Sequence, residues 1–474
     1  MHTAEVEKLL RSDGGSPGRS WPPKSEALTW DLVQARRRRY DNDPAQLFPY
    51  RTDLHIPGDA KATQARQRDY CPVPLARDIA RFSSQLLFSE PPKLTIEDEV
   101  AGPALDAWTS FNRLDQFLAD AGDNIAAEGS GALRIIRDDH VSGTFPLIIA
   151  EPADRVIWAT AHGRYTTGGV VVVERDSEEH GVRWRLLEYH GPGVVRRALF
   201  KGSLTGLGSR VELGAGPLEF QKLRAEVFTG VDKPTLIKCD NVPGGHSDIA
   251  GLDSLLDAID DAETVGKKKL RGSKPLTFVN RKLSDAAGDA DLDGAILIGE
   301  GTMSPIEEPN QLAQVVQGRM EAEDHRVYTD HLRELAVSMA GYSLASWGFG
   351  DGGRADSGRA LKLRQVRTLL TRSGKERIAR EAISEAVGVA VAMMLGRSEV
   401  VKPEIQFGDG FPEDAIERAE ELAKLRDAGL ISTRQALREL HPDFDEDKIA
   451  EELQEIQAET PTSDPVRDLL NGVG

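Results

Sequence analysis

Residues 373–376 (Ser-Gly-Lys-Glu) come nearest, in type and spacing, to a loop that could bind a phosphate. Such a loop needs a second glycine five residues before Gly374, a hydroxyl residue after Lys375 to hold magnesium, and a strand in front of it. Here Glu376 stands where the hydroxyl residue is needed, and the surrounding pattern is helical. The glycines of residues 348–352 (Gly-Phe-Gly-Asp-Gly) also follow a predicted helix. Neither pattern predicts a nucleotide site.

The spacing of Asp443, Asp445 and Asp447 is similar to the start of a calcium loop. However, Lys448 takes the position of the required glycine, and Gln454 takes the position of the last acidic ligand. Acidic residues at the start of a helix are the better interpretation, because they complement the helix dipole.

Histidine and cysteine give no metal-binding pattern either. His325 and His331 are six residues apart, which differs from the i,i+4 spacing of helical zinc ligands. Cys71 and Cys239 are distant and form no Cys-x-x-Cys motif, so we expect free thiols in a reducing compartment. We therefore predict no enzyme, no catalytic residue, no metal and no cofactor.

The composition limits the classes of protein to which the chain can belong. The chain has 474 residues, enough for two to four domains, and 39% of them are hydrophobic. Its formal charge of −18 argues against a general coat for nucleic acid, although local basic patches are compatible with it. No apolar run approaches the roughly 20 residues needed to cross a bilayer. The N-terminus also lacks the pattern of a signal peptide, so we expect no membrane association.

The chain is organised around residues 333–395, predicted as a helix, a glycine-rich break and a second, very long helix. The break covers residues 346–354, and the long helix could run from Ser357 to Met394 without a proline. Its second half has an apolar stripe of Ala379, Ala382, Ile383, Ala386, Val387, Ala390, Val391 and Met394. Its first half is basic, with Arg359, Lys362, Arg364, Arg367, Arg372, Lys375, Arg377 and Arg380.

Around this stretch the pattern changes several times. Residues 26–42 are predicted to be helical and contain four consecutive arginines, 36–39, which we interpret as a solvated helix face, with a phosphate or partner contact as the alternative. Strand-like runs with polar turns fill residues 131–239 and predict an antiparallel meander. Further predicted elements are helices at 72–90, 103–128 and 247–271, strands at 276–280 and 295–298, a return to helix at 311, and three short helices after 407.

The order and spacing of these parts resemble the portal (head-to-tail connector) proteins of tailed bacteriophages, of siphophage type. The resemblance covers nearly the whole chain and is carried by residues 65–92, 245–260 (Gly-His-Ser-Asp-Ile-Ala-Gly-Leu-Asp-Ser-Leu-Leu-Asp-Ala-Ile-Asp), 357–362 (Ser-Gly-Arg-Ala-Leu-Lys) and 428–432 (Ala-Gly-Leu-Ile-Ser). It implies an α+β portal fold with an α/β wing, a two-helix stem, a small β-containing clip and a short helical crown. The implied divisions are a flexible tail (1–25), wing (26–245), stem helix (246–272), clip (273–310), stem helix (311–340), tunnel loop (341–356), long wing helix (357–398), crown (399–459) and flexible tail (460–474).

The resemblance further implies a ring of about twelve copies at one capsid vertex, assembled in the host cytoplasm and retained in the virion. Its channel would pass double-stranded DNA during packaging and ejection. Its partners would be terminase, the major capsid and scaffolding proteins, and a head-completion (adaptor) protein. Acidic residues on repeated subunits would repel phosphates, so that DNA slides without sticking.

Three groups of residues are the candidates for these roles. The tunnel loop would present Trp347, Gly348, Phe349, Gly350, Asp351, Gly352, Gly353 and Arg354. The stem would contribute Asp257, Asp261, Lys267, Lys268, Lys269 and Arg271 to the channel. The clip would dock terminase or adaptor through Leu276, Phe278, Asn280, Ile296 and Ile298. For Trp347 and Phe349, packing into the helix junction is the alternative to lining the DNA path.

Two other classes of protein stay open at this point. A DNA-processing enzyme could use the basic first half of the long helix, although no metal or nucleophile motif accompanies it. A capsid-assembly interaction protein without a channel is the second alternative.

Overall fold

The computed structural model describes residues 3–11, 20–162, 165–272, 276–280, 297–298, 301–302, 304–306, 314–316, 322–349, 363–408, 415–441, 444 and 446–459. The chain divides into two compact units, one of Met1–Ala355 with Ala360–Gly408 and one of Asp356–Arg359 with Asp409–Gly474. Helices and sheets occur together in the first unit, so the expected α+β class is confirmed.

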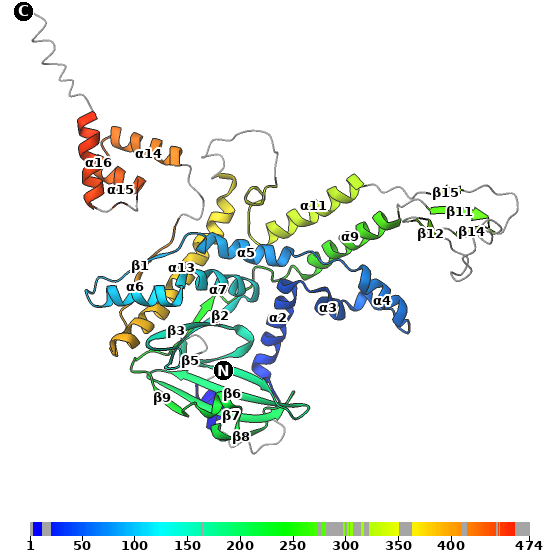
Figure 1. Ribbon diagram of the computed structural model, residues 1–474, viewed down its shortest axis with the longest axis horizontal. Helices are drawn as coiled ribbons and strands as arrows, with labels where there is room; N and C mark the ends of the chain where they lie inside the picture. Colours follow the sequence, from blue (N-terminus) through cyan, green and yellow to red (C-terminus); the bar gives the residue numbers. More distant parts are fainter. Residues whose placement is uncertain are drawn as a thin grey trace, which may run out of the picture. The chain divides into compact units, whose positions relative to one another are not determined.

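Two antiparallel sheets form the lower part of the first unit in Figure 1. One has the order β10-β2-β3, formed by β2 (Ser130–Asp138), β3 (Ser142–Pro152) and β10 (Leu236–Asp240). The other has the order β4-β5-β6-β7-β8, with β9 also paired to β7. Its strands are β4 (Val156–Ala161), β5 (Tyr165–Asp176), β6 (Val182–Gly191), β7 (Val194–Ser203), β8 (Ser209–Val211) and β9 (Glu226–Phe228). The predicted meander over residues 131–239 is confirmed.

The N-terminus corrects one expectation. Residues 1–25, predicted to be a flexible tail, contain helix α1 (Thr3–Arg11). Its Val6, Leu9 and Leu10 are buried on the larger sheet, where the register aligns Val172, Leu187 and Ala198 on one face. The i, i+3, i+4 spacing of the three α1 residues is that of an amphipathic helix, which the Gly and Pro residues after it obscured.

Three helices cover the smaller sheet: α6 (Ala101–Asn112), α7 (Leu114–Glu128) and α13 (Val366–Leu395) (Figure 1). Helix α5 (Leu75–Phe88) packs on α7 and α13. The single helix predicted over 103–128 is wrong, because Arg113 takes a left-handed conformation with φ of 48° and separates α6 from α7. The Asn112 amide fixes this break, donating to the carbonyls of Trp108 and Pro146 at 3.2 and 3.1 Å.

Helix α13 is the central element of this core. The helix expected to run uninterrupted from Ser357 is interrupted at Gln365, whose ψ of 1° is not helical, and α13 begins at Val366. Residues 350–362 lie outside the described residues. The predicted stripe is buried, but residues 386–393 are buried on every side, so this half is a core helix and not an amphipathic one. Alongside it, β1 (Lys93–Thr95) pairs with β16 (Glu404–Gln406).

Helices α9 (Asp253–Gly272) and α11 (Ala322–Met339) form a hairpin that extends from this core (Figure 1). Short strands lie between them in sequence: β11 (Leu276–Asn280), β12 (Leu297–Ile298), β13 (Gly301–Thr302), β14 (Ser304–Ile306) and β15 (Gln314–Val316). The predicted strand at 276–280 is confirmed. The predicted return to helix at residue 311 is wrong, because β15 pairs with β11 there and the helix starts at Ala322. The helix predicted from residue 247 likewise begins only at Asp253.

The second unit contains α14 (Ala415–Asp427), α15 (Thr433–Leu440) and α16 (Glu446–Glu459), as the three predicted short helices. The Ser432 side chain caps α15 by accepting from the Gln435 amide at 3.1 Å. The remaining elements all belong to the first unit. They are α2 (Lys24–Asp41), α3 (Pro44–Leu47), α4 (Ala60–Asp69), α8 (Leu218–Gln221), η1 (Phe48–Tyr50), η2 (Thr52–Leu54), η3 (Ala153–Arg155), η4 (Leu213–Ala215) and η5 (Leu344–Trp347).

Candidate functional site

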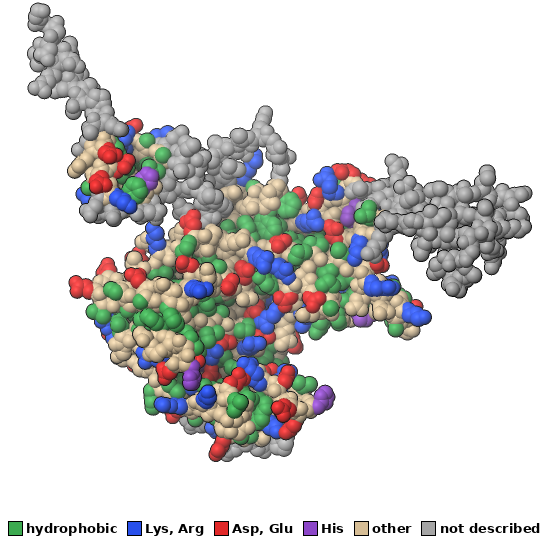
Figure 2. Space-filling model, in the orientation of Figure 1, with side chains coloured by type: hydrophobic (Ala, Val, Ile, Leu, Met, Phe, Trp, Pro, Cys, Tyr) green, Lys and Arg blue, Asp and Glu red, His purple; other side chains and the backbone are tan. Residues whose placement is uncertain are grey.

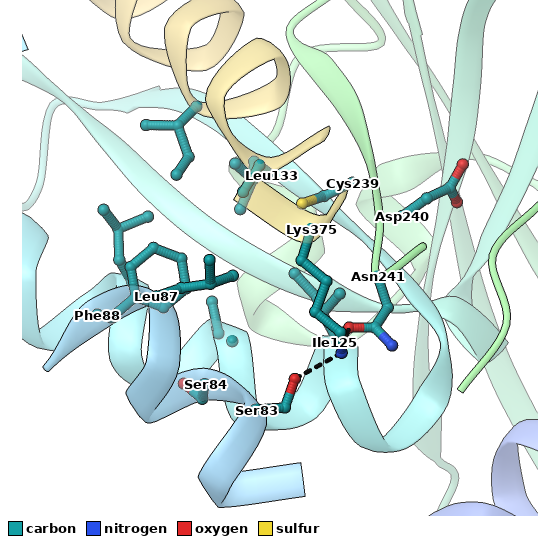
Figure 3. Close-up of a pocket in the computed structure, with 15 residues that line it drawn as sticks. Ser83, Ser84, Leu87, Phe88, Ile125, Leu133, Cys239, Asp240, Asn241 and Lys375 are labelled. Atoms are coloured by element: carbon teal, nitrogen blue, oxygen red, sulfur yellow. Dashed lines mark hydrogen bonds between the residues drawn. The ribbon is translucent and has the colours of Figure 1, made fainter. Parts of the chain in front are cut away.

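Lys375 of α13 lies at a buried junction of four chain segments (Figure 3). Its ammonium donates to Ser83 Oγ of α5 at 2.6 Å and to Asn241 Oδ1 after β10 at 2.9 Å. It also contacts both carboxylate oxygens of Asp248, at 2.6 and 2.5 Å. Tyr342, just after α11, donates its hydroxyl to the same carboxylate at 3.2 Å. The side chains of Lys375 and Asp248 are only 1% and 5% exposed.

Burial and charge act in opposite directions on this pair. Burial lowers the pKa of Lys375, while the adjacent Asp248 acts to raise it. Burial and the same carboxylate raise the pKa of Tyr342 well above its ordinary value, so this hydroxyl remains a donor. The cavity beside Lys375 measures about 30 Å³, room for about one water and far too small for a nucleotide. The arrangement is therefore a structural ion pair.

The segment after α11 is fixed to α13 by hydroxyl groups. Thr371 Oγ1 donates to the Gly341 carbonyl at 2.7 Å, and Gly341 has a φ of 94° that favours glycine. The fully buried Thr368 accepts the Ser343 amide at 2.9 Å and contacts Ser346 Oγ at 3.0 Å. These bonds hold the base of the predicted tunnel loop against the start of α13.

Within that loop, the described residues reach Phe349. The Trp347 ring lies 5.2 Å from the Phe82 ring of α5, in the contact expected from the packing alternative. Gly348 has a φ of 75°, and the Phe349 amide donates to the Leu344 carbonyl at 3.1 Å. The other candidates, Gly350, Asp351, Gly352, Gly353 and Arg354, lie outside the described residues.

The acidic candidates of α9 face the N-terminal segment. Asp257 is paired with Arg39 and lies 3.4 Å from Arg51. Asp261 accepts from Arg51 at 2.7 Å. The buried Asp260, which sequence reasoning missed, accepts from Arg39 at 3.1 Å.

The basic candidates of α9 differ among themselves. Lys267 donates to the Asp69 carbonyl of α4 at 3.1 Å, whereas Lys268 and Lys269 are exposed. Arg271 lies in the last turn of α9, and its side chain is outside the described residues.

The arginine run 36–39 makes contacts within the chain. Arg36 donates to the Glu128 carbonyl at 2.8 Å, and Arg37 pairs with the Glu128 carboxylate. Arg38 lies over the Tyr50 ring at 3.8 Å. With Arg39 bound to α9, every arginine of the run has an intramolecular contact, so the expected solvated face is wrong.

Of the clip candidates, Leu276, Phe278 and Asn280 belong to β11, with Phe278 opposite both Ser304 of β14 and Gln314 of β15. Ile298 belongs to β12, opposite Gly301. Ile296 lies outside the described residues.

The basic first half of the long helix also makes internal contacts. Arg372 donates to the carbonyl of Leu86 at 2.7 Å and to that of Gly408, and Arg380 donates to that of Ile405 at 3.2 Å. On the face shown in Figure 2, acidic and basic side chains are interspersed. The described residues hold no cluster of three or more candidate metal ligands. Arg364, Arg367 and Arg377 of the same basic stretch are exposed, so the basic surface behind the DNA-processing alternative is retained in part.

The comparisons with known proteins agree with the sequence resemblance. Residues 254–465 match the family model described as "Phage portal protein, SPP1 Gp6-like". No curated protein shows significant similarity to the chain. Among the helices that the structure describes, none has the length and hydropathy of a membrane span.

Two similar solved structures are the "Neck of empty GTA particle computed with C6 symmetry" and the "Virion of native gene transfer agent (GTA) particle". The first is 13% identical with a TM-score of 0.43, and covers 81% of this chain and 94% of that chain. The second is 12% identical with a TM-score of 0.43, and covers 92% and 98%. Likeness at this level carries no argument. The family match over residues 254–465, a little under half of the chain, confirms the resemblance to the portal (head-to-tail connector) proteins of tailed bacteriophages.

Proposed function

We propose that this protein is a phage portal protein that forms a ring of about twelve copies at one capsid vertex. The ring would enclose a channel for double-stranded DNA during packaging and ejection. It would dock terminase and head-completion proteins, contact the capsid and scaffolding proteins, and remain in the virion. The observation that carries this proposal is the portal family match, which spans the α9–α11 hairpin, α13 and the second unit.

Exposed apolar residues on the hairpin support assembly into a closed oligomer. Tyr328, Leu335 and Met339 of α11 are 54%, 41% and 55% exposed, although α11 packs on α9, where His325 contacts the Ala262 carbonyl. Leu363 and Leu370, before and within α13, are 67% and 69% exposed. Such surface on one copy gains burial when a neighbour covers it.

In this proposal the hairpin is the stem, residues 273–310 are the clip and residues 341–356 are the tunnel loop. Asp257 and Asp261 would influence the channel only through the net charge they share with Arg39 and Arg51, because their carboxylates are paired. Lys268 and Lys269 are exposed, and Lys268 lies 3.9 Å from the Asp69 carboxylate of α4. The protein itself would not be an enzyme, and the energy for packaging would come from the terminase.

Negative-stain images and native mass spectrometry of the purified protein test the proposal. We expect a discrete species with a central hole, and neither ATP hydrolysis nor DNA cleavage with magnesium or manganese. A protein that stays monomeric at high concentration would refute the ring. Nuclease activity that is lost on a single carboxylate substitution would favour the DNA-processing alternative.

A further inference from the structure

The first half of α13 carries exposed apolar side chains on the face that points away from the core. Val366 and Leu370 are 43% and 69% exposed. At 100° per residue, Val366, Leu370 and Gly374 follow one another in steps of about 40°, so they form one stripe along the helix. The buried Thr368 and Lys375 lie about 140° or more from the middle of this stripe. The stripe is therefore not part of the core of the first unit.

Gly374 is a gap in this stripe that packing within one copy does not require. A glycine inside a helix is less favourable than an alanine, yet a Cβ at Gly374 would meet no described atom within 4 Å. Gly388 of the same helix differs, because its Cβ would come to 2.8 Å from the Val401 carbonyl. A missing side chain on an open helix surface allows the backbone of a second element to approach closely. The gap between Leu370 and Arg377 therefore fits a helix that comes from outside the copy.

Two arginines border the stripe on the same side of α13. Arg367 and Arg377 are exposed and lie about 60° and 20° from Leu370 around the helix. Within the described part of the chain, no acidic side chain forms an ion pair with either of them. We call these five residues, Val366, Arg367, Leu370, Gly374 and Arg377, the outer patch of α13. Its apolar middle and basic border call for a partner with apolar and acidic side chains.

The charge of the chain indicates what that partner is. A second copy presents a mostly acidic surface, because each copy has a formal net charge of −18. Two outer patches placed face to face would repel, which disfavours a self-complementary contact. Contact of the patch with a different surface of the next copy is heterologous, and such contacts close into a ring when the rotation permits. DNA would engage the arginines, but its phosphates would gain nothing from Val366 and Leu370.

We propose that a helix of the next copy covers the outer patch of α13 in the assembled ring. The inference rests on the proposed ring and names a surface through which one copy receives its neighbour. The backbone of that helix would lie over Gly374, and its apolar side chains would cover Val366 and Leu370. Its acidic side chains would pair with Arg367 and Arg377.

Filling the gap tests the close approach of that helix. Gly374→Leu should leave the single copy folded, because leucine favours a helix and its Cβ meets no described atom there. We expect the ring fraction, measured by native mass spectrometry, to fall by about tenfold or more, since the added side chain occupies the site of the neighbour. The matched control is Gly143→Leu on β3, an exposed glycine whose Cβ likewise meets nothing within 4 Å. The control should form rings as the wild type does.

Charge reversal tests the acidic character of the partner. Arg367→Glu with Arg377→Glu would join like charges at every interface, and we expect the ring fraction to fall by about tenfold or more. Because the two substitutions also make the whole chain more negative, the control is Arg210→Glu with Lys222→Glu, at two exposed basic residues of β8 and after α8. Circular dichroism of each variant establishes that it is folded.

The outcomes separate this inference from the ring itself. If the wild-type chain forms no ring, the proposed function fails. If the wild type forms rings, the inference is overturned when either patch variant assembles as well as its control. It is equally overturned if the arginine variant keeps its rings and loses binding to a duplex oligonucleotide, because the patch would then contact DNA.

A photo-crosslinking amino acid at position 370 supplies a measurement on rings whose glycine and arginines are unchanged. We expect adducts that join two copies, with the attached peptide coming from a helix of the second copy. The control is the same variant diluted until it is monomeric, which should give no adduct between copies. Rings without such adducts, or with adducts that map to a strand, would overturn the inference.

Discussion

Replacing Lys375 by methionine would test the buried junction most directly. Methionine keeps most of the volume but removes the donor to Ser83, Asn241 and Asp248. The Asp248 carboxylate, 5% exposed, would remain buried without its cation. Breaking a buried pair on one side costs about 3–5 kcal/mol of stability. Since tenfold corresponds to about 1.4 kcal/mol, opening of this region should become about 10²–10⁴ times more frequent.

Hydrogen exchange of backbone amides is the suitable assay, because it reports the local opening of the junction separately from the unfolding of the rest of the chain. Amides of residues 370–383 and 248–256 should lose protection together. The control is Lys402→Met, at a side chain 45% exposed and 3.6 Å from Glu385. That change should alter protection by no more than about 0.5 kcal/mol.

The double variant Lys375→Met with Asp248→Asn completes the test. Asparagine retains an acceptor for the Tyr342 hydroxyl but carries no charge, so most of the lost protection should return. If the amides of residues 370–383 and 248–256 exchange no faster in Lys375→Met than in Lys402→Met, the Lys375–Asp248 pair contributes nothing to the stability of the junction, and the prediction is refuted.

Four further substitutions should change stability in a defined direction. Gly388→Ala brings a Cβ to 2.8 Å from the Val401 carbonyl and should lower the melting temperature. Gly374→Ala in the same helix meets nothing within 4 Å and should raise the melting temperature, because helix propensity favours alanine over glycine by up to about 1 kcal/mol. Burial lowers the pKa of His190 to about 3, so the unfolded chain takes up a proton that the folded chain does not, and stability should fall by about 1.4 kcal/mol per pH unit from about 6.5 downward. His190→Asn should flatten that dependence in melting curves between pH 7 and 4. Arg37→Ala leaves buried Glu128 without its cation and should cost toward the lower end of about 3–5 kcal/mol in thermal unfolding. An unchanged melting temperature in either glycine variant would contradict the packing or propensity argument made for that glycine. An unaltered pH slope in His190→Asn, or an unchanged stability in Arg37→Ala, would contradict the argument from the burial of His190 or Glu128.

Short sequence patterns predicted those elements that depend only on neighbouring residues. Alternating β-branched residues gave the meander, and the Ser432 cap gave α15. Predictions failed where a distant partner decides the structure. The break at Arg113 depends on the Pro146 carbonyl, and β15 depends on β11, some 35 residues earlier. Helix propensity depends on nearby residues and therefore identifies neither of these distant partners.

The junction around Lys375 shows the same contrast between local and distant determinants of structure. The sequence placed Lys375 in an imperfect phosphate loop and in the basic half of the long helix, whereas its partners Ser83 and Asp248 are 292 and 127 residues away. No spacing rule reaches over such distances. The arginine run was misread for the same reason, because Glu128 and Asp257 are remote in sequence.

The junction explains how a hairpin this exposed is fixed to its core. Asp248 lies just before the first residue of α9, and Tyr342 lies just after the last residue of α11. The Tyr342 hydroxyl donates to the Asp248 carboxylate, and this carboxylate binds Lys375. The two ends of the hairpin therefore meet at Lys375 of α13. Its far end has no comparable attachment among the described residues. Ion pairs of Asp257, Asp260 and Asp261 with Arg39 and Arg51 attach α9 to the N-terminal segment as well, so the hairpin is held both at its base on α13 and along α9.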